Sequence, residues 1–269
     1  MRRAVKVFIL FFLGLQSLPA SPDVLVLVHG YLGSASSWET SGVNAMLAQN
    51  GWQRAGLATP QGILPGPGGN AVNKVYPVEL PSLAPIAVQA NLLGGMVSAI
   101  SARHPDESLI LAGHSAGGVV ARMVLVQGGA PQTKRLITIG SPHLGTMRAV
   151  EALDATDSSG LFGIIKDFFG GDLYDLVQDS WGVLIDLTPA QPGSLLYWLN
   201  TQPHPDIDYI SVMRPGPVGI GDAMVPLFSQ DMNNVPALAG KSQRIVVAAS
   251  HELQSADGVG LVNILNKED

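Results

Sequence analysis

A continuously apolar run at residues 24–28 (VLVLV) constrains the fold more than any other feature of the sequence. A strand that is apolar on both faces must be covered on both faces, as in a parallel sheet flanked by helices. Similar short runs recur at residues 108–112, 135–139, 209–213 and 244–249. Helical patterns lie between the runs, at residues 43–49, 85–103 and 117–126. Strands and helices that alternate in this way predict an α/β doubly wound sheet.

The N-terminus has the pattern of a secretory signal peptide rather than of a folded element. Arg2, Arg3 and Lys6 precede an apolar run at residues 7–15, and a small residue, Ala20, follows. The run is much shorter than the ~20 apolar residues that span a membrane. We therefore expect residues 1–20 to be removed and the protein to be secreted or periplasmic, with no stable membrane anchor. An uncleaved anchor helix is the alternative.

Composition limits the classes of protein and partner. The 269 residues are 46% hydrophobic and 13% charged, so residues 21–269 suffice for one domain with its own core. Loss of three basic residues with the signal peptide would change the net charge from −6 to −9, which argues against nucleic acid as a partner. The absence of cysteine excludes disulfides, thiol chemistry and a cysteine-linked lipid anchor.

The run at residues 108–112 leads into a Gly-x-Ser-x-Gly motif centred on Ser115. A serine on a sharp strand-to-helix turn crowds its neighbours, so a Cβ at Gly113 or Gly117 would clash. Such a turn lifts the serine hydroxyl clear of the sheet and leaves the Ala116 N–H at a helix N-terminus, where it faces a developing oxyanion. We therefore predict Ser115 as a catalytic nucleophile. A phosphate-binding loop, the alternative, would need a Gly-Lys-Ser/Thr sequence that is missing here.

The loop after residues 24–28 begins His29-Gly30-Tyr31-Leu32. A strand that leads into His-Gly supplies the loop whose backbone N–H completes an oxyanion hole, which we assign to Tyr31. We expect His29 to fix this loop through hydrogen bonds rather than to act as the base.

Chain order then identifies the base and the acid, because the nucleophile of such a turn is followed by Asp or Glu and then by His. The one histidine beyond position 210 is His251, directly after the run at residues 244–249. For the acid we predict Asp222, which follows the run at residues 209–213, with Asp208 and Asp231 as alternatives. None of the histidines shows a His-x-x-x-His spacing, so we predict no metal.

Two segments interrupt the alternation of strands and helices. Residues 59–72 are rich in Gly and Pro and predict a long loop. Residues 144–206 form an insertion between two predicted strands, which we expect to be a cap or a mobile lid over the site. Candidate residues of a substrate pocket, in this insertion and beside the motifs, are Leu32, His114, His143, Leu161, Ile165 and Phe168.

Five stretches of the chain resemble one family. VLVHGYLGS, LAGHSAGGVVAR, TIGSPHLGT, DLTPAQPGSLLYWLN and GDAMVP together resemble the bacterial triacylglycerol lipase and esterase branch of the α/β-hydrolases, and the related lipid-deacylase group. The resemblance covers Val24 to His251 and implies the α/β-hydrolase fold. Its catalytic positions fall on Ser115, Asp222 and His251, and its oxyanion positions on Tyr31 and Ala116.

The resemblance also has departures. Asp222-Ala223 stands where these lipases often have Asp-Gly, and the calcium ligands of some members have no match here, so we predict no cofactor. The two leading strands of the larger fold have no counterpart, which predicts a compact sheet of about six strands.

The expected function is hydrolysis of carboxylic esters, with an ester or lipid as substrate and transient contact with a lipid interface. An acyltransferase, a thioesterase or an amidase would use the same three catalytic residues. A binding protein on a retained hydrolase fold is a further alternative, and it predicts a broken triad.

Overall fold

A computed structural model of the protein describes residues 22–154 and 178–267. Its centre is a seven-stranded sheet in which every neighbouring pair is parallel. From edge to edge the strands are β2 (Trp52–Arg54), β5 (Asn73–Pro77), β1 (Asp23–Val28), β6 (Ser108–His114), β7 (Thr133–Ile139), β8 (Asp208–Met213) and β9 (Ser242–Val246). The sheet confirms the predicted α/β class.

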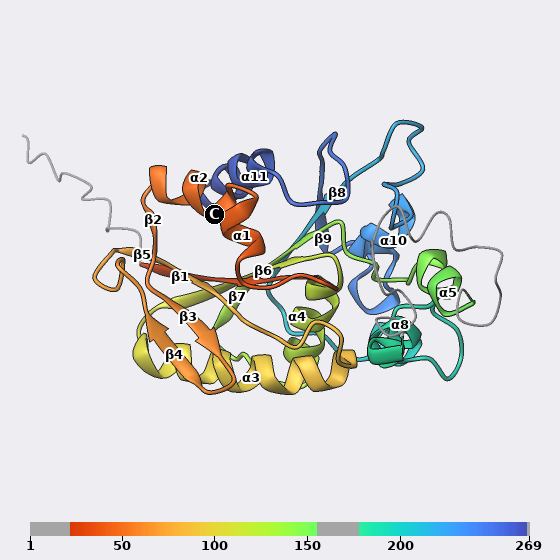
Figure 1. Cartoon of the computed structure of the whole chain (residues 1–269), viewed down its shortest axis with the longest axis horizontal. Helices are drawn as coiled ribbons and strands as arrows, with labels where there is room; N and C mark the ends of the chain where they lie inside the picture. The colour runs from red at the N-terminus through yellow and green to blue at the C-terminus, as the bar shows by residue number, and fades with distance from the viewer. Residues whose placement is uncertain (1–21, 155–177, 268–269) are drawn as a thin grey trace, which may run out of the picture.

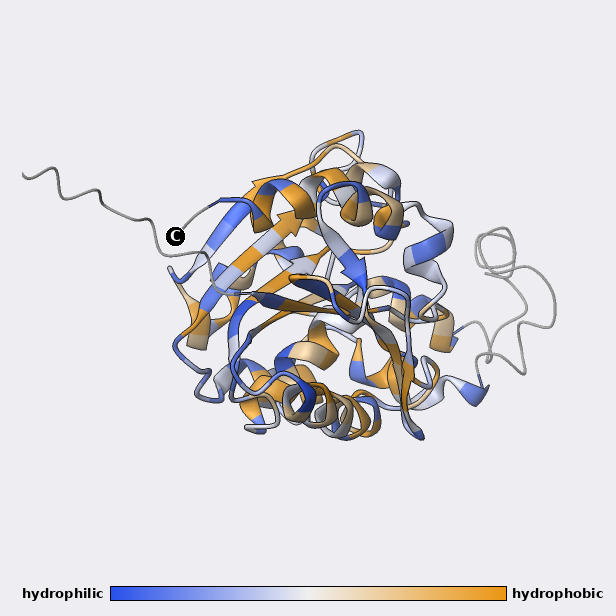
Figure 2. Cartoon of the chain, turned by 90° about the vertical axis from the view of Figure 1, so that its left-hand side faces the viewer, coloured by the Kyte–Doolittle hydropathy of each residue, from blue (hydrophilic) through white to orange (hydrophobic). Residues whose placement is uncertain are grey.

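Helices cover both faces of the sheet (Figure 1). The helices α3 (Ile86–Arg103) and α4 (Ala116–Val126) lie on one face, and α1 (Ser37–Thr40), α2 (Val43–Gln49) and α11 (Ser255–Leu265) lie on the other. In β1 the residues Val24, Val26 and Val28 belong to the first core, whereas Leu25 and Leu27 belong to the second. Figure 2 shows hydrophobic residues along the central strands and the helices beside them. Both faces of β1 are therefore buried, as its sequence predicts.

The strand order reverses at β1, which pairs with β5 on one side and with β6 on the other. In open α/β sheets such a reversal leaves a crevice at the carboxyl ends of the two strands. The register pairs Val28 with Gly113, so β1 and β6 end side by side. The loops that carry the His-Gly and Gly-x-Ser-x-Gly motifs therefore meet at this crevice.

The sheet has one strand more than the six expected. Neither β2 nor β5 carries an apolar run, and β5 (NKVYP) is still buried along most of its length. Lys74 of β5 is buried because its ammonium group bonds both carboxylate oxygens of Glu107, at 2.8 and 3.0 Å. The predicted loop at residues 59–72 is also partly wrong. An antiparallel hairpin, β3 (Gly56–Thr59) and β4 (Gly62–Pro65), occupies its first part.

Segments between the last strands complete the site. The insertion between β7 and β8 contains α5 (Met147–Asp154), α8 (Trp181–Asp186) and α9 (Leu195–Thr201), and its residues 155–177 lie outside the described ranges. Between β8 and β9 lie α10 (Leu227–Gln230) and two short 3₁₀ helices, η1 (Met232–Asn234) and η2 (Pro236–Leu238).

Helix α9 is bound to the core of the domain. Arg122 of α4, fully buried, donates a hydrogen bond to the side-chain oxygen of Asn200 in α9. The Asn200 amide in turn donates to the backbone oxygen of His143 at 3.0 Å. This end of the insertion is therefore packed as part of the core.

Candidate active site

Ser115 lies on a sharp turn between β6 and α4. Its backbone dihedrals are φ 52° and ψ −128°, a strained conformation for a residue with a side chain, and its N–H donates to Ile139 at 2.9 Å. A Cβ on Gly113 would lie 2.5 Å from the Gly118 Cα, and one on Gly117 would overlap the His29 carbonyl. The turn therefore needs its glycines, as the motif predicts.

Three side chains predicted from separate parts of the sequence form one hydrogen-bonded chain. His251 Nε2 lies 2.9 Å from Ser115 Oγ, and His251 Nδ1 lies 3.0 Å from Asp222 Oδ2. The Asp222 side chain is 1% exposed and that of His251 is 10% exposed. The candidate nucleophile, base and acid thus have the spacing that nucleophilic catalysis requires.

The environment of Asp222 determines which ring nitrogen of His251 carries the proton. Burial of the Asp222 carboxyl acts to raise its pKa. The hydrogen bond and charge of His251 and the N–H groups of Val225 (2.7 Å) and Met224 (2.8 Å) outweigh burial, so its pKa lies below the ordinary value. The ionised carboxylate only accepts, so His251 Nδ1–H donates to it. Nε2 is then left with a lone pair that accepts the Ser115 hydroxyl proton.

The two alternative acids lie elsewhere. Asp208 begins β8 and pairs with Arg135 at 2.9 Å. Asp231 precedes η1 and accepts from the Asn233 N–H at 2.9 Å. The structure therefore brings only Asp222, of the three candidates, to His251.

The loop that carries His251 is held by a buried arginine just beyond β8. Arg214 Nη1 donates to the backbone oxygens of Ser250 (2.6 Å), His251 and Glu252 (3.1 Å). Its Nη2 lies 2.8 Å from Asp257 Oδ1 in α11, and both side chains are 0% exposed. Sequence reasoning missed Arg214, although an arginine directly after an apolar strand was a usable signal.

His114 supports the same loop from the other side. Burial, followed by the charges of His251 and Arg214, holds the pKa of His114 well below its ordinary value. The ring is therefore neutral, and its Nε2–H donates to the His251 backbone oxygen at 2.8 Å. The two imidazole rings lie 5.2 Å apart.

The His-Gly loop lies against Ser115. A Cβ on Gly30 would come within 2.8 Å of the Ser115 Cβ, so the backbone before Tyr31 passes directly beside the serine. His29 is buried, which lowers its pKa, and its Nε2 accepts from the Leu80 N–H at 3.1 Å. Its Nδ1–H then donates to the Gly30 oxygen at 3.1 Å. These bonds fit the loop-fixing role expected of His29.

The second expected oxyanion donor, Ala116, is the first residue of α4. Its N–H belongs to the first turn of the helix, where backbone N–H groups have no partner within the helix and the helix dipole favours negative charge. Tyr31 and Ala116 therefore come from the two loops that meet at the crevice.

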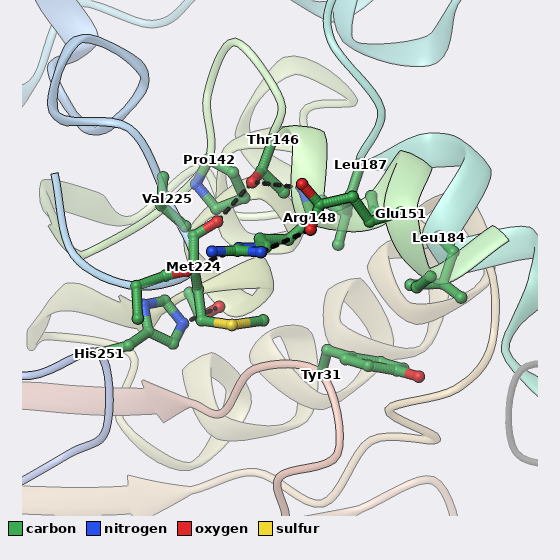
Figure 3. Close-up of a pocket in the computed structure, with 14 residues that line it drawn as sticks. Tyr31, Pro142, Thr146, Arg148, Glu151, Leu184, Leu187, Met224, Val225 and His251 are labelled. Carbon is green, nitrogen blue, oxygen red and sulfur yellow. Dashed lines mark hydrogen bonds and ion pairs between the residues drawn. The ribbon is translucent and has the colours of Figure 1, made fainter. Parts of the chain in front are cut away.

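Two cavities adjoin Ser115, and they share Tyr31, Ser115 and His251. The first, of about 140 Å³, has largely apolar walls from α5, α8 and the loop after Asp222 (Figure 3). Its apolar residues include Ala149, Ala152, Leu184, Leu187, Met224 and Val225. We call it the apolar cavity.

The second, of about 470 Å³, is lined by residues of the His-Gly loop, of α1 and of the segment after His251. They supply backbone and hydroxyl groups, the Glu252 carboxylate and two apolar side chains, Leu32 and Leu253. We call it the polar cavity. Its hydroxyl-bearing residues, apart from Tyr31 and Ser115, are Ser37, Thr40 and Ser41.

The predicted pocket residues have different outcomes. Leu32 and His114 line the polar cavity. His143 does not line either cavity, which corrects the prediction. It is 0% exposed, accepts from Arg122 at 3.2 Å and lies 3.1 Å from the Thr138 hydroxyl, so it holds the core together. The other three candidates, Leu161, Ile165 and Phe168, lie outside the described residues.

Within residues 22–154 and 178–267, no three His, Asp or Glu side chains are grouped to hold a metal ion. None of the helices in these ranges combines the length and apolar character of a membrane span.

Comparison with known proteins supports the fold assignment. A family model described as a PGAP1-like alpha/beta domain matches residues 86–158. No curated protein matches the chain. Among solved structures, the mature lipase BlEst2 of Bacillus licheniformis is 17% identical with a TM-score of 0.63, and the match covers 92% of each chain.

Two further structures extend this likeness. The product of gene lin2722 of Listeria innocua is 17% identical with a TM-score of 0.59, over 92% of this chain and 95% of that one. An extracellular alpha/beta-hydrolase of a Paenibacillus species is 15% identical with a TM-score of 0.50, over 91% and 98%. The chain has the fold of these proteins, and this agrees with the α/β-hydrolase fold that its sequence motifs predict.

Proposed function

We propose that the protein is a secreted serine hydrolase that cleaves carboxylic esters with an apolar acyl group. The main support for the proposal is the chain of hydrogen bonds from Asp222 through His251 to Ser115. Ser115 and His251 also line the apolar cavity. The likeness to a lipase fold supports the same class of reaction.

The reaction would run through an acyl-enzyme. His251 Nε2 takes the Ser115 proton as Oγ bonds to the ester carbonyl carbon, and Asp222 stabilises the imidazolium. The carbonyl oxygen gains negative charge and faces the N–H groups of Tyr31 and Ala116. His251 then gives its proton to the alcohol oxygen as the C–O bond breaks. Water, deprotonated by the same nitrogen, attacks the acyl carbon, and the acid is released as Ser115 regains its proton.

Other acyl-group chemistries would use the same residues, and only the reaction itself separates them. The test is a panel of an octanoyl ester, thioester and anilide, assayed in water and with an added alcohol acceptor. We expect the ester to be hydrolysed with the highest kcat/KM. Preferred cleavage of the anilide or thioester, or transfer to the alcohol in place of hydrolysis, would assign the protein to an alternative class.

A binding protein on this fold would need no working triad. The intact hydrogen-bonded chain of Asp222, His251 and Ser115 favours the enzyme.

The role of residues 144–206 and the route out of the cell belong to the same proposal. Helices α5 and α8 wall the apolar cavity, which fits a cap, and α9 is fixed to the core through Asn200. Higher activity on emulsified than on dispersed long-chain esters would favour a mobile lid and contact with a lipid interface, and equal activity a fixed cap. N-terminal sequencing of the exported protein tests cleavage after Ala20.

A further inference from the structure

We propose that the polar cavity binds the alcohol part of the ester, and that this alcohol is a neutral polyol with free hydroxyl groups. The inference rests on the proposed ester hydrolysis and adds the class of alcohol. It concerns a site whose walls come from α1 and from the residues on either side of the two catalytic loops.

The arrangement of the cavities gives the two halves of an ester different surroundings. When Ser115 Oγ bonds to the carbonyl carbon, the acyl and alcohol parts extend from that carbon in different directions. The apolar and polar cavities both begin at Ser115 and His251 and then follow different elements. An acyl chain loses water favourably in the apolar cavity. The alcohol part of the ester then lies in the polar cavity.

The hydroxyl groups of the polar cavity can form hydrogen bonds with a ligand. Thr40 donates its hydroxyl proton to the Ser36 backbone oxygen at 3.1 Å, which leaves its oxygen to accept. Ser37 accepts from the Ser34 N–H at 3.1 Å, and Ser41 accepts from the Val43 N–H at 3.5 Å. Their O–H groups remain to donate. The wall therefore offers both donors and acceptors, which match the hydroxyls of a polyol.

The charged residues that line the polar cavity favour neutral alcohols over anionic ones. Among the described residues that line the polar cavity, Glu252 is the one acidic side chain, and none is lysine or arginine. A phosphate on the alcohol would find no cation to pair with and would face the Glu252 carboxylate. The hydroxyls of a neutral polyol, in contrast, can donate to that carboxylate.

A fully esterified glycerol is also a poor fit. Its second and third acyl chains would cover the hydroxyls of the polar cavity without replacing their hydrogen bonds to water, and unsatisfied polar groups are costly to bury. We therefore expect monoesters of polyols to be preferred over triacylglycerols.

Three octanoate esters with the same three-carbon alcohol chain test the proposal, assayed as dispersed monomers. They are monooctanoylglycerol, propyl octanoate, which lacks the two free hydroxyls, and octanoylglycerol phosphate, which adds an anion. We expect kcat/KM for the glycerol ester to exceed that for the propyl ester by about tenfold, the value of one to two hydrogen bonds. The phosphate ester should have the lowest kcat/KM of the three. Glu252→Gln should raise this value relative to that of the glycerol ester.

Variants of residues in the polar cavity test whether this cavity causes the preference for the glycerol ester. Thr40→Val and Ser41→Ala should each lower the ratio of glycerol-ester to propyl-ester kcat/KM by about threefold or more. Thr201→Val is the matched control, because Thr201 lies in α9, outside both cavities, and makes the same kind of helix back-bond to the Trp198 oxygen. That variant should leave the ratio unchanged.

A ratio of one or less, or a ratio that neither cavity variant lowers, would overturn the polyol proposal while the ester hydrolysis stands. Absence of cleavage of every octanoate ester would instead overturn the proposed function on which it rests.

Discussion

Arg214 and Asp257 form an ion pair of 2.8 Å in which both side chains are fully buried, directly behind the loop that carries the candidate base. The same guanidinium bonds three consecutive backbone oxygens of that loop, from Ser250 to Glu252. The position of His251 relative to Ser115 therefore depends on a residue that touches neither substrate nor nucleophile.

Removal of Arg214 should separate its structural role from its positioning role. Arg214→Met leaves Asp257 buried without its cation, so we expect a loss of about 3–5 kcal/mol of unfolding free energy in urea. The double variant Arg214→Met/Asp257→Asn should recover part of that stability. Its kcat should remain at least about tenfold low at unchanged KM, because a positioning defect raises the barrier of the chemical step by ~1.4 kcal/mol or more. Recovery of kcat together with stability would show that Arg214 has no positioning role.

Asp222→Asn should lower kcat by about 10³–10⁴-fold with little change in KM. The amide group that replaces one carboxylate oxygen no longer favours the tautomer with Nδ1–H, so Nε2 loses the lone pair that accepts the serine proton. Asp208→Asn is the matched control, because Asp208 pairs with Arg135 away from the site. Equal losses in the two variants would argue against Asp222 as the acid. Steady-state kinetics on a soluble octanoate ester provides the measurement.

Gly117→Ala should destabilise the protein by several kcal/mol, because its Cβ would overlap the His29 carbonyl beneath the turn. Gly95→Ala is the control. Gly95 also lies in a helix, α3, where an added Cβ meets nothing within 4 Å, so alanine should stabilise by about 0.5–1 kcal/mol. Urea unfolding of both variants compares a glycine required by close packing with one that is not. Equal effects would contradict the account of the turn.

Stability should fall as the pH falls below 6.5. Burial first, and then the charge of Arg122, hold the pKa of His143 well below its ordinary value, and His114 is lowered in the same way. The unfolded chain therefore binds more protons than the folded one between these lowered values and 6.5. Within this pH range, each such histidine lowers the free energy of unfolding by about 1.4 kcal/mol for every unit by which the pH falls. Above pH 6.5 the stabilisation by the neutral histidine is fully present.

The thermal midpoint at pH 7.5, 6 and 5 measures this effect. It should fall between pH 7.5 and 5, and His143→Gln should flatten the decrease, because a neutral amide can still accept from Arg122. A midpoint that is independent of pH in this range would contradict the prediction.

The sequence predicted the parts of the molecule whose burial or chemistry leaves a local pattern. Four strands, β1, β6, β7 and β8, were found because their apolar residues are buried on both faces, and the largely exposed edge strand β9 because it overlaps an apolar run. Ser115 was found because its turn needs Gly117. The strand at Asn73–Pro77 escaped detection because Lys74 is buried through its ion pair with Glu107, a contact over 33 positions that no local pattern records. Arg214 directly follows an apolar strand, which marks it as unusual, but its role was missed because its partners lie up to 43 positions away in sequence.

His143 shows the opposite error. A histidine at the end of a strand was taken for a pocket residue, yet its ring is wholly occupied by Arg122 and the Thr138 hydroxyl. Burial of a polar side chain is decided by partners from other elements, and the sequence alone does not reveal them.

The central claim is that Ser115 is a nucleophile activated by His251. Incubation of the folded protein with a fluorophosphonate probe, followed by peptide mass spectrometry, tests it most directly. We predict a single adduct on Ser115 that is absent from Ser115→Ala and forms at least about 10²-fold more slowly in His251→Gln, the usual contribution of a general base. A folded protein that gains no adduct, or that is labelled at another residue with Ser115 unmodified, would contradict the claim.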